Sequence, residues 1–140
     1  MNVILDTNIW VSFLFGKQLH TVADLFSNQN IRVYVSRELI AELACVLARP
    51  KIRQHISDQS IEAMWSFMRE QCLPIEDYPS EDAMARDAKD AYLLDMAKAI
   101  PADYIVTGDK DLLVLGKYNQ TTILSYNDFR LLLLGMNLQK

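Results

Sequence analysis

Near the N-terminus, a short apolar run is followed directly by three polar residues, in the order Val3-Ile4-Leu5-Asp6-Thr7-Asn8. Such a run indicates a buried β-strand, and Thr7 or Asn8 can cap a helix over residues 9–14. Further along the chain, Tyr104-Ile105-Val106 is followed in the same way by Thr107-Gly108-Asp109. The sequence therefore predicts two buried strands, each with an acidic residue soon after its end.

Segments typical of strands alternate with segments typical of helices along the rest of the chain. Further strands are predicted at residues 31–35, 73–75 and 121–124. Helical spacing of apolar residues predicts helices over 19–28, from Ser36 to a stop at Pro50, and over 61–68, 88–99, 112–115 and 129–134. This alternation predicts an α/β fold, with a parallel sheet of about four or five strands and helices on both faces.

The length of 140 residues suits one domain over 1–140, and 51% hydrophobic with 23% charged residues is a globular balance. No apolar run reaches the ~18 residues of a membrane span, and no secretory signal is visible. Two cysteines, Cys45 and Cys72, are too few for a disulfide framework, and both lie in apolar segments. We therefore expect reduced, buried thiols and a cytoplasmic location without membrane contact.

Acidic residues are concentrated in one region of the chain. Ten of the 18 acidic residues lie between Glu76 and Asp111, with only four of the 14 basic ones, and the whole chain carries a net charge of −4. This balance disfavours a generic basic nucleic-acid binder. It does not disfavour a cation site, because a divalent metal offsets part of the negative charge.

Several acidic residues should meet at one edge of the predicted sheet. Asp6, Asp109 and Asp111 follow strand ends, where ligands bind in open parallel sheets, and Glu42 and Asp90 lie on helices that can face the same edge. Carboxylates this close repel one another unless a cation joins them. An all-oxygen set suits Mg²⁺ or Mn²⁺, and such an ion favours phosphodiester hydrolysis by a metal-activated water.

Motifs of other chemistries are missing. His20 and His55 are far apart and have no cysteine nearby, so zinc spacing is absent. The chain also has neither a Gly-x-x-x-x-Gly-Lys-Ser/Thr loop nor a Gly-x-Ser-x-Gly elbow. Nucleoside-triphosphate hydrolysis and serine hydrolysis are therefore disfavoured.

Four segments, in this order and spacing, resemble the PIN-domain family. They are Val3–Asn8, Ser36-Arg37-Glu38-Leu39-Ile40-Ala41-Glu42-Leu43, Arg86-Asp87-Ala88-Lys89-Asp90 and Ala102-Asp103-Tyr104-Ile105-Val106-Thr107-Gly108-Asp109-Lys110-Asp111-Leu112-Leu113. Each segment alone is a weak signal, whereas the four together are a strong one, and the resemblance extends over residues 1 to about 134. The nearest subgroup is the PIN-domain toxins of prokaryotic toxin–antitoxin systems.

The resemblance implies a three-layer α/β/α sandwich and a metal-dependent ribonuclease, with an antitoxin that blocks its site and often a homodimer. Many relatives have proline at the position of Ala88 and an acid at that of Lys89, so this chain lacks a fifth acid there but keeps Asp90. Carried over by motif, Asp6, Glu42, Asp90 and Asp109 are the catalytic metal ligands, Asp111 is an additional acid, and Thr7, Asn8 and Thr107 position water or carboxylates.

Ordinary structural roles compete with these assignments. Asp6 can be a helix cap, Asp90 a partner of a helix dipole, and Asp87 is best explained as the N-cap of the helix that starts near Ala88. Glu42 can be a solvated helix residue, and Asp109 and Asp111 can be turn residues. A basic cluster can hold RNA phosphates or be a solvated helix end; it comprises Arg37, Arg49, Lys51 and Arg53.

Three functions remain open at this point. The leading hypothesis is a Mg²⁺- or Mn²⁺-dependent endoribonuclease that cleaves single-stranded RNA and acts as a toxin. The second is a catalytically silent PIN-like module that binds RNA or protein. The third is a phosphotransferase or phosphatase with Asp6 as nucleophile, although Asn8 stands where a second aspartate is expected.

Overall fold

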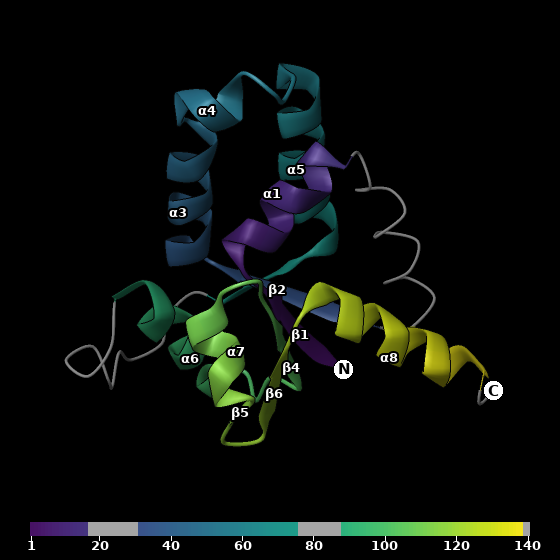
Figure 1. Cartoon of the computed structure of the whole chain (residues 1–140). Coiled ribbons are helices and arrows are strands. Elements are labelled where there is room, and N and C mark those ends of the chain that lie inside the picture. Colours follow the sequence, from purple (N-terminus) through teal and green to yellow (C-terminus); the bar gives the residue numbers. More distant parts are fainter. Residues whose placement is uncertain (17–30, 76–87, 139–140) are drawn as a thin grey trace.

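A six-stranded sheet forms the middle of the molecule in the computed structural model, which describes residues 1–16, 31–75 and 88–138. The strand order is β3-β2-β1-β4-β6-β5 (Figure 1). All neighbouring strands are parallel except β5 and β6. The strands are β1 (Asn2–Leu5), β2 (Arg32–Ser36), β3 (Leu73–Ile75), β4 (Tyr104–Val106), β5 (Lys117–Tyr118) and β6 (Thr121–Leu124).

Helices follow the strands along the chain and cover both faces of the sheet (Figure 1). They are α1 (Thr7–Phe15), α3 (Arg37–Leu47), α4 (Pro50–Arg53), α5 (Asp58–Gln71), α6 (Ala88–Ala99), α7 (Lys110–Leu115) and α8 (Tyr126–Leu138). The helix predicted over 19–28 lies outside the described residues. None of the described helices is both long and apolar enough to cross a membrane.

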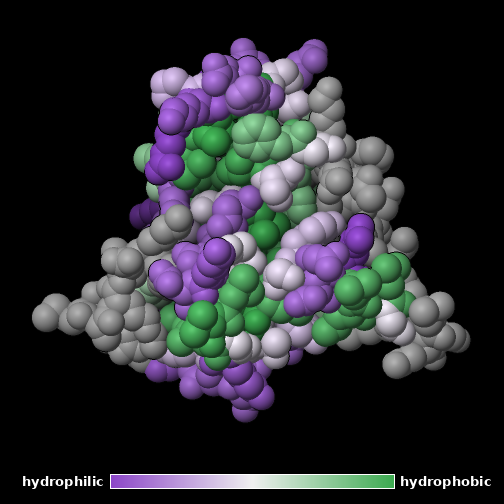
Figure 2. Space-filling view, in the orientation of Figure 1, coloured by the Kyte–Doolittle hydropathy of each residue, from purple (hydrophilic) through white to green (hydrophobic). Residues whose placement is uncertain are grey.

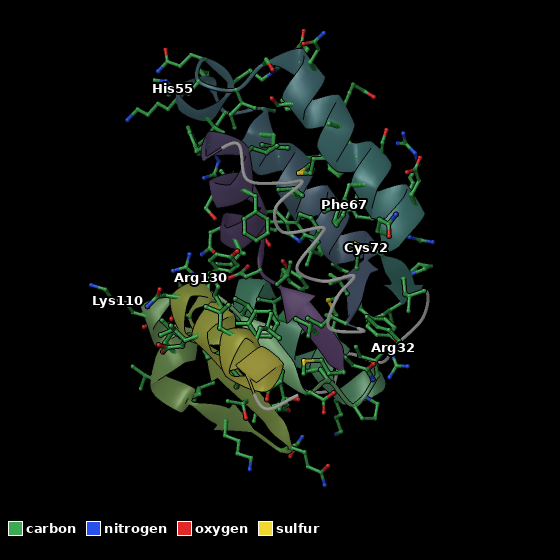
Figure 3. The ribbon with its side chains drawn as sticks, turned by 90° about the vertical axis from the view of Figure 1, so that its right-hand side faces the viewer. Arg32, His55, Phe67, Cys72, Lys110 and Arg130 are labelled. Atoms are coloured by element: carbon green, nitrogen blue, oxygen red, sulfur yellow. The ribbon has the colours of Figure 1, made fainter. Side chains whose placement is uncertain are left out.

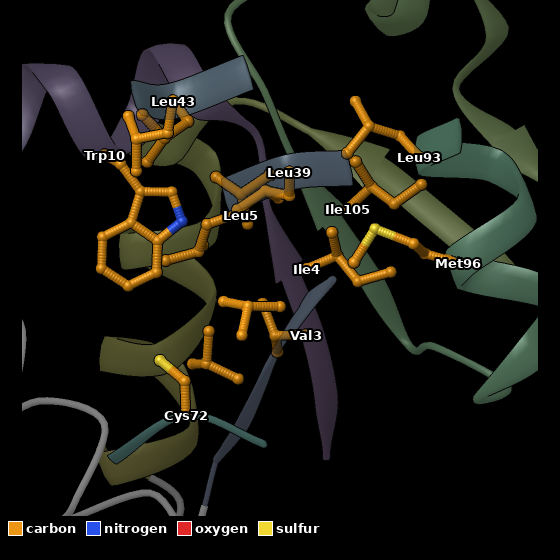
Figure 4. Packing of buried hydrophobic residues seen from close by; sticks show 14 of the residues in the cluster. Val3, Ile4, Leu5, Trp10, Leu39, Leu43, Cys72, Leu93, Met96 and Ile105 are labelled. Carbon is orange, nitrogen blue, oxygen red and sulfur yellow. The ribbon is translucent and has the colours of Figure 1, made fainter. Parts of the chain in front are cut away.

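The central strand β1 packs against side chains on both of its faces. Ile4 lies beside Ile105 and Met96, whereas Leu5 lies beside Trp10 on the other face, and all five side chains are buried (Figure 4). Because successive strand residues point to opposite faces, the buried part of β1 needs apolar residues at each position from Val3 to Leu5. This two-sided burial confirms the predicted three-layer α/β arrangement.

The sheet gains a sixth strand that the sequence did not predict. Gly116 ends α7 with a φ of +66°, and Asn119 has a φ of +54° in the tight connection between β5 and β6. Positive φ values suit glycine and asparagine, which turn the chain back along β6. A strand of two residues carries no periodic pattern, so only this turn chemistry could have indicated it.

Two local predictions were wrong. Pro50 does not end a helix: α3 ends at Leu47, and Pro50 is the first residue of α4, a position at which its missing N–H costs nothing. Cys45 is exposed rather than buried, because α3 turns Leu43 and Leu47 toward the core and Cys45 away from it. Cys72 is buried, as predicted.

Candidate active site

The ends of β1 and β4 lie side by side and at the same level. Leu5 pairs with Val106, and the backbone N–H of Asp6 donates to the Val106 carbonyl at 2.9 Å. Asp6 and Thr107 are the next residues on the two strands, so both leave the sheet at its carboxyl edge. This is the edge at which open parallel sheets bind ligands.

Asp6 is held by three hydrogen bonds. It is the N-cap of α1, in place of the predicted Thr7 or Asn8, and its Oδ1 accepts from the Thr7 backbone N–H at 2.7 Å and from the Thr7 hydroxyl at 3.3 Å. Its Oδ2 accepts from the Thr107 hydroxyl at 2.7 Å. Asp6 is only 1% exposed, so these bonds fix both oxygens of a buried carboxylate.

Thr107 connects Asp6 to Asp109. Its buried hydroxyl donates to Asp6 and accepts from the backbone N–H of Asp109 at 3.0 Å. Asp109 is the N-cap of α7, and its Oδ1 accepts from the Asp111 backbone N–H at 2.9 Å. One hydroxyl therefore sets the positions of two acidic residues that are 103 positions apart in the sequence.

Asn8 and Asp111 lie at the solvent side of this network. The Asn8 side-chain oxygen accepts from the Gly108 backbone N–H at 3.4 Å, which ties the start of α1 to the turn after β4. Asp111 is exposed, and the contact described for it is the one that its backbone makes with Asp109. Thr7, Asn8 and Thr107 thus all contact the turns that carry the acidic residues.

Glu42 is held outside this network, by a hydrogen bond between α3 and α6. It lies half-buried on α3, and its Oε2 accepts a hydrogen bond from the hydroxyl of Tyr92 on α6. A second contact joins the same helices, since the Ser36 hydroxyl donates to the Met96 sulfur at 3.1 Å. Sequence reasoning missed Tyr92, because no motif marks a single tyrosine within this helix.

The structure brings some of the predicted ligands together and not others. Asp6 and Asp109 share Thr107, whereas Glu42 is bonded to Tyr92. Asp90 is in the first turn of α6, but its side chain lies outside the described part of the chain, and Asp87 lies outside it altogether. Within the described residues, no three acidic, histidine or cysteine side chains converge closely enough to hold a metal ion.

Comparison with known proteins gives one match. Residues 2–111, which include β1, α3, β4 and the Asp6–Thr107–Asp109 network, match the PIN domain. The chain belongs to the PIN-domain family. Comparisons with curated proteins and with solved structures gave no match. Membership in the PIN-domain family supports a nuclease fold and a divalent metal ion as its cofactor.

The described acids of this PIN domain fit a hydrated divalent ion. Mg²⁺ prefers oxygen ligands, retains several waters and is usually bound through one or two carboxylates. Asp6 and Asp109 supply two carboxylates at one edge, because the Thr107 hydroxyl donates to the Asp6 carboxylate and accepts from the Asp109 backbone N–H. A closed set of three described acids is therefore not required for binding.

The predicted basic cluster is divided between the two ends of α3. Arg37 begins α3 beside the sheet, and Arg49 and Lys51 lie at its far end, about 16 Å away at 1.5 Å per residue. Arg53 forms an ion pair with Asp58. These four residues therefore do not form one compact phosphate site.

Two other cations, Lys110 and Arg130, follow the carboxyl ends of β4 and β6 along the chain. Lys110 follows Asp109 directly, and Arg130 is on α8, which follows β6; Figure 3 shows both on the same side of the molecule, away from His55. The ring of Tyr126 packs against that of Phe13, with 5.1 Å between the ring centroids. Burial raises the pKa of Tyr126, and the positive charge of Arg130 offsets part of this increase. A basic residue just after a strand end is the sequence signal that could have indicated Lys110.

Proposed function

We propose that the protein is an endoribonuclease that hydrolyses phosphodiester bonds of single-stranded RNA with Mg²⁺ or Mn²⁺, and that it is the toxin of a toxin–antitoxin pair. The observation that carries the proposal is the hydrogen-bonded network of Asp6, Thr107 and Asp109 at the carboxyl edge of a PIN domain. A buried carboxylate whose hydrogen bonds are this well defined is a pre-oriented ligand.

Four acids are proposed to hold the ion: Asp6, Glu42, Asp90 and Asp109, with Asp111 as an additional ligand. When bound, such an ion polarises the phosphate and lowers the pKa of a bound water. Thr107 and Thr7 keep the oxygens of Asp6 in place, and the Asp111 backbone orients Asp109. Hydrolysis by this route needs no covalent intermediate on the enzyme.

RNA phosphates need cations beside the acidic edge. Lys110 is exposed and directly follows Asp109, and Arg130 is exposed on the same side of the molecule as Lys110 (Figure 3). These positions support a role for both cations in binding the strand close to the scissile bond. Arg37 at the start of α3 can bind the same strand further along. Arg49, Lys51 and Arg53 at the far end of α3 are proposed only as contacts for a longer RNA.

The test is cleavage of a mixed single-stranded RNA by purified protein, with Mg²⁺ or Mn²⁺ and then with excess chelator. Asp6→Asn should abolish cleavage. Asp103→Asn is the matched control: Asp103 precedes β4 at the opposite edge of the sheet, where it accepts from the Asn2 backbone N–H at 2.7 Å, and this variant should cleave as the wild type does. Full metal-dependent cleavage by Asp6→Asn would refute the assignment.

One observation favours the alternative of a catalytically silent binding module. In the parts of the chain that the structure describes, three acids do not converge on one point. A module of this kind would bind RNA without turnover under either metal. Titration of the protein with Mn²⁺ separates the two functions, because the nuclease must bind the ion and the silent module need not.

Partner binding is proposed on the apolar surface that the fold leaves exposed. Leu131 and Leu134 on α8, and Val114 and Leu115 on α7, are exposed and form apolar patches in Figure 2. Such patches commonly mark protein interfaces, which supports both a homodimer and a contact with an antitoxin. We propose that the chain forms these contacts as a single cytoplasmic domain over residues 1–140. Light scattering of the purified chain, alone and with a co-expressed antitoxin, tests both contacts.

A further inference from the structure

Tyr92 lies where the two helices that carry Glu42 and Asp90 meet. Its hydroxyl donates to the Glu42 Oε2 across the contact between α3 and α6. Asp90 precedes Tyr92 by two residues on α6, a rise of about 3 Å along the helix axis. The Tyr92–Glu42 bond therefore fixes Glu42 against the face of α6 that carries Tyr92, less than one turn from Asp90 along the helix axis.

A second bond shows how the two helices run past one another. The Ser36 hydroxyl, at the start of α3, donates to the sulfur of Met96, one turn beyond Tyr92 on α6. The two helices therefore run in opposite directions where they touch: Ser36 lies beside Met96, and Glu42, further along α3, lies beside Tyr92, earlier on α6. Two bonds at separate points set the register, so Glu42 is kept next to the N-terminal end of α6.

Glu42 needs such support more than the other described acids do. Asp6 and Asp109 are N-caps and each accept a bond from a nearby backbone N–H, whereas Glu42 is in the middle of α3, where backbone N–H groups bond within the helix. Its longer side chain also has more rotamers to lose on ordering. A carboxylate can accept several hydrogen bonds, so the Tyr92 hydroxyl leaves capacity for a metal ion.

We propose that Tyr92 is a positioning residue of the metal centre, which acts by holding the Glu42 carboxylate in one position near the N-terminal end of α6. This inference rests on the proposed metal-dependent function. Loss of a hydrogen bond to a ligating carboxylate typically lowers metal affinity by about 10- to 100-fold. We expect a loss at the lower end, about 10-fold, because Glu42 is one of four proposed ligands.

Tyr92→Phe tests the proposal, since it removes the hydroxyl and keeps the ring. Tyr104→Phe is the matched control, because Tyr104 is also half-buried and packs its ring against Phe129 at the other end of β4. Calorimetric titration of each purified protein with Mn²⁺, without RNA, should show about 10-fold weaker binding by Tyr92→Phe only. With RNA, the Mn²⁺ concentration for half-maximal cleavage should rise, and kcat at saturating Mn²⁺ should stay near the wild-type value.

A double-mutant cycle shows whether Tyr92 acts through Glu42. In a Glu42→Gln background, Tyr92→Phe should cost no further Mn²⁺ affinity. Equal Mn²⁺ affinity of wild type and Tyr92→Phe overturns the role of Tyr92 and leaves the proposed nuclease intact. An equal loss in both backgrounds also overturns it, because the hydroxyl would then act independently of Glu42. A wild-type protein that binds no Mn²⁺ overturns the nuclease and this inference together.

Discussion

Replacing Thr107 by valine should lower the free energy of unfolding by more than this small change in side-chain shape suggests. The substitution keeps the shape of a fully buried side chain and removes the hydroxyl that bonds both Asp6 and the Asp109 backbone. A hydrogen bond to a charged group contributes about 1.5–3 kcal/mol and a neutral one about 1 kcal/mol. We expect Thr107→Val to lower the free energy of unfolding by about 3 kcal/mol.

Thr121→Val is the matched control for this substitution. Thr121 is 3% exposed, and its hydroxyl makes one neutral bond, to the Ala102 carbonyl at 2.7 Å, so its loss should cost about 1 kcal/mol. The added methyl group contributes similarly in both variants and cancels in the difference of about 2 kcal/mol. Urea unfolding followed by circular dichroism measures this difference, provided that m is unchanged. Equal losses in the two variants would refute the linking role of Thr107.

Three further predictions concern the core and the thiols. Trp10→Phe should lower the free energy of unfolding by about 1–3 kcal/mol in urea unfolding, because it leaves a small cavity in the core. The buried indole N–H has no acceptor among the described residues and should add nothing to this loss, so a loss well above about 3 kcal/mol would indicate an acceptor. Near pH 8 a thiol reagent should label the exposed Cys45 and, until denaturant is added, should spare Cys72, because burial raises the pKa of Cys72 to about 12. Mass spectrometry counts the adducts, and two adducts on the native protein would contradict the burial of Cys72. In the same unfolding assay, Leu133→Ala should cost about 2–5 kcal/mol, because the Leu133 side chain is 0% exposed. Leu131→Ala should cost under about 0.5 kcal/mol, because the Leu131 side chain is 54% exposed. Equal costs would contradict the packing of α8.

The sequence predicts those parts of the site that depend on strand ends. Asp6 and Asp109 each follow a short apolar run, and the carboxyl-edge rule is enough to place them together. Thr107 was predicted only through the family resemblance, and its two hydrogen bonds depend on the pairing of β1 with β4, which local sequence does not specify. The same limit applies to Tyr92, because its contact with Glu42 depends on how α3 packs against α6.

Surface features were harder to predict because helix phase and helix ends determine them. Arg37, Arg49 and Lys51 are close in sequence, but the length of α3 separates the first from the other two. Cys45 lies in an apolar segment and still points outward, since its neighbours Leu43 and Leu47 take the buried positions. An error of one or two residues in the phase of a predicted helix exchanges its buried and exposed positions. The same error in a short strand that is buried on both faces changes little, because every position of that strand is buried.

Helix capping and metal binding are complementary roles for these acids. Asp6 and Asp109 accept hydrogen bonds from backbone N–H groups at helix starts, and the positive end of a helix favours negative charge there. Asp90 occupies the first turn of α6, where the same field acts. Three of the four proposed ligands therefore lie where the backbone itself favours carboxylates before any cation binds. Glu42 is the exception, because it lies in mid-helix, away from a helix start, and the donor described for it is the side chain of Tyr92.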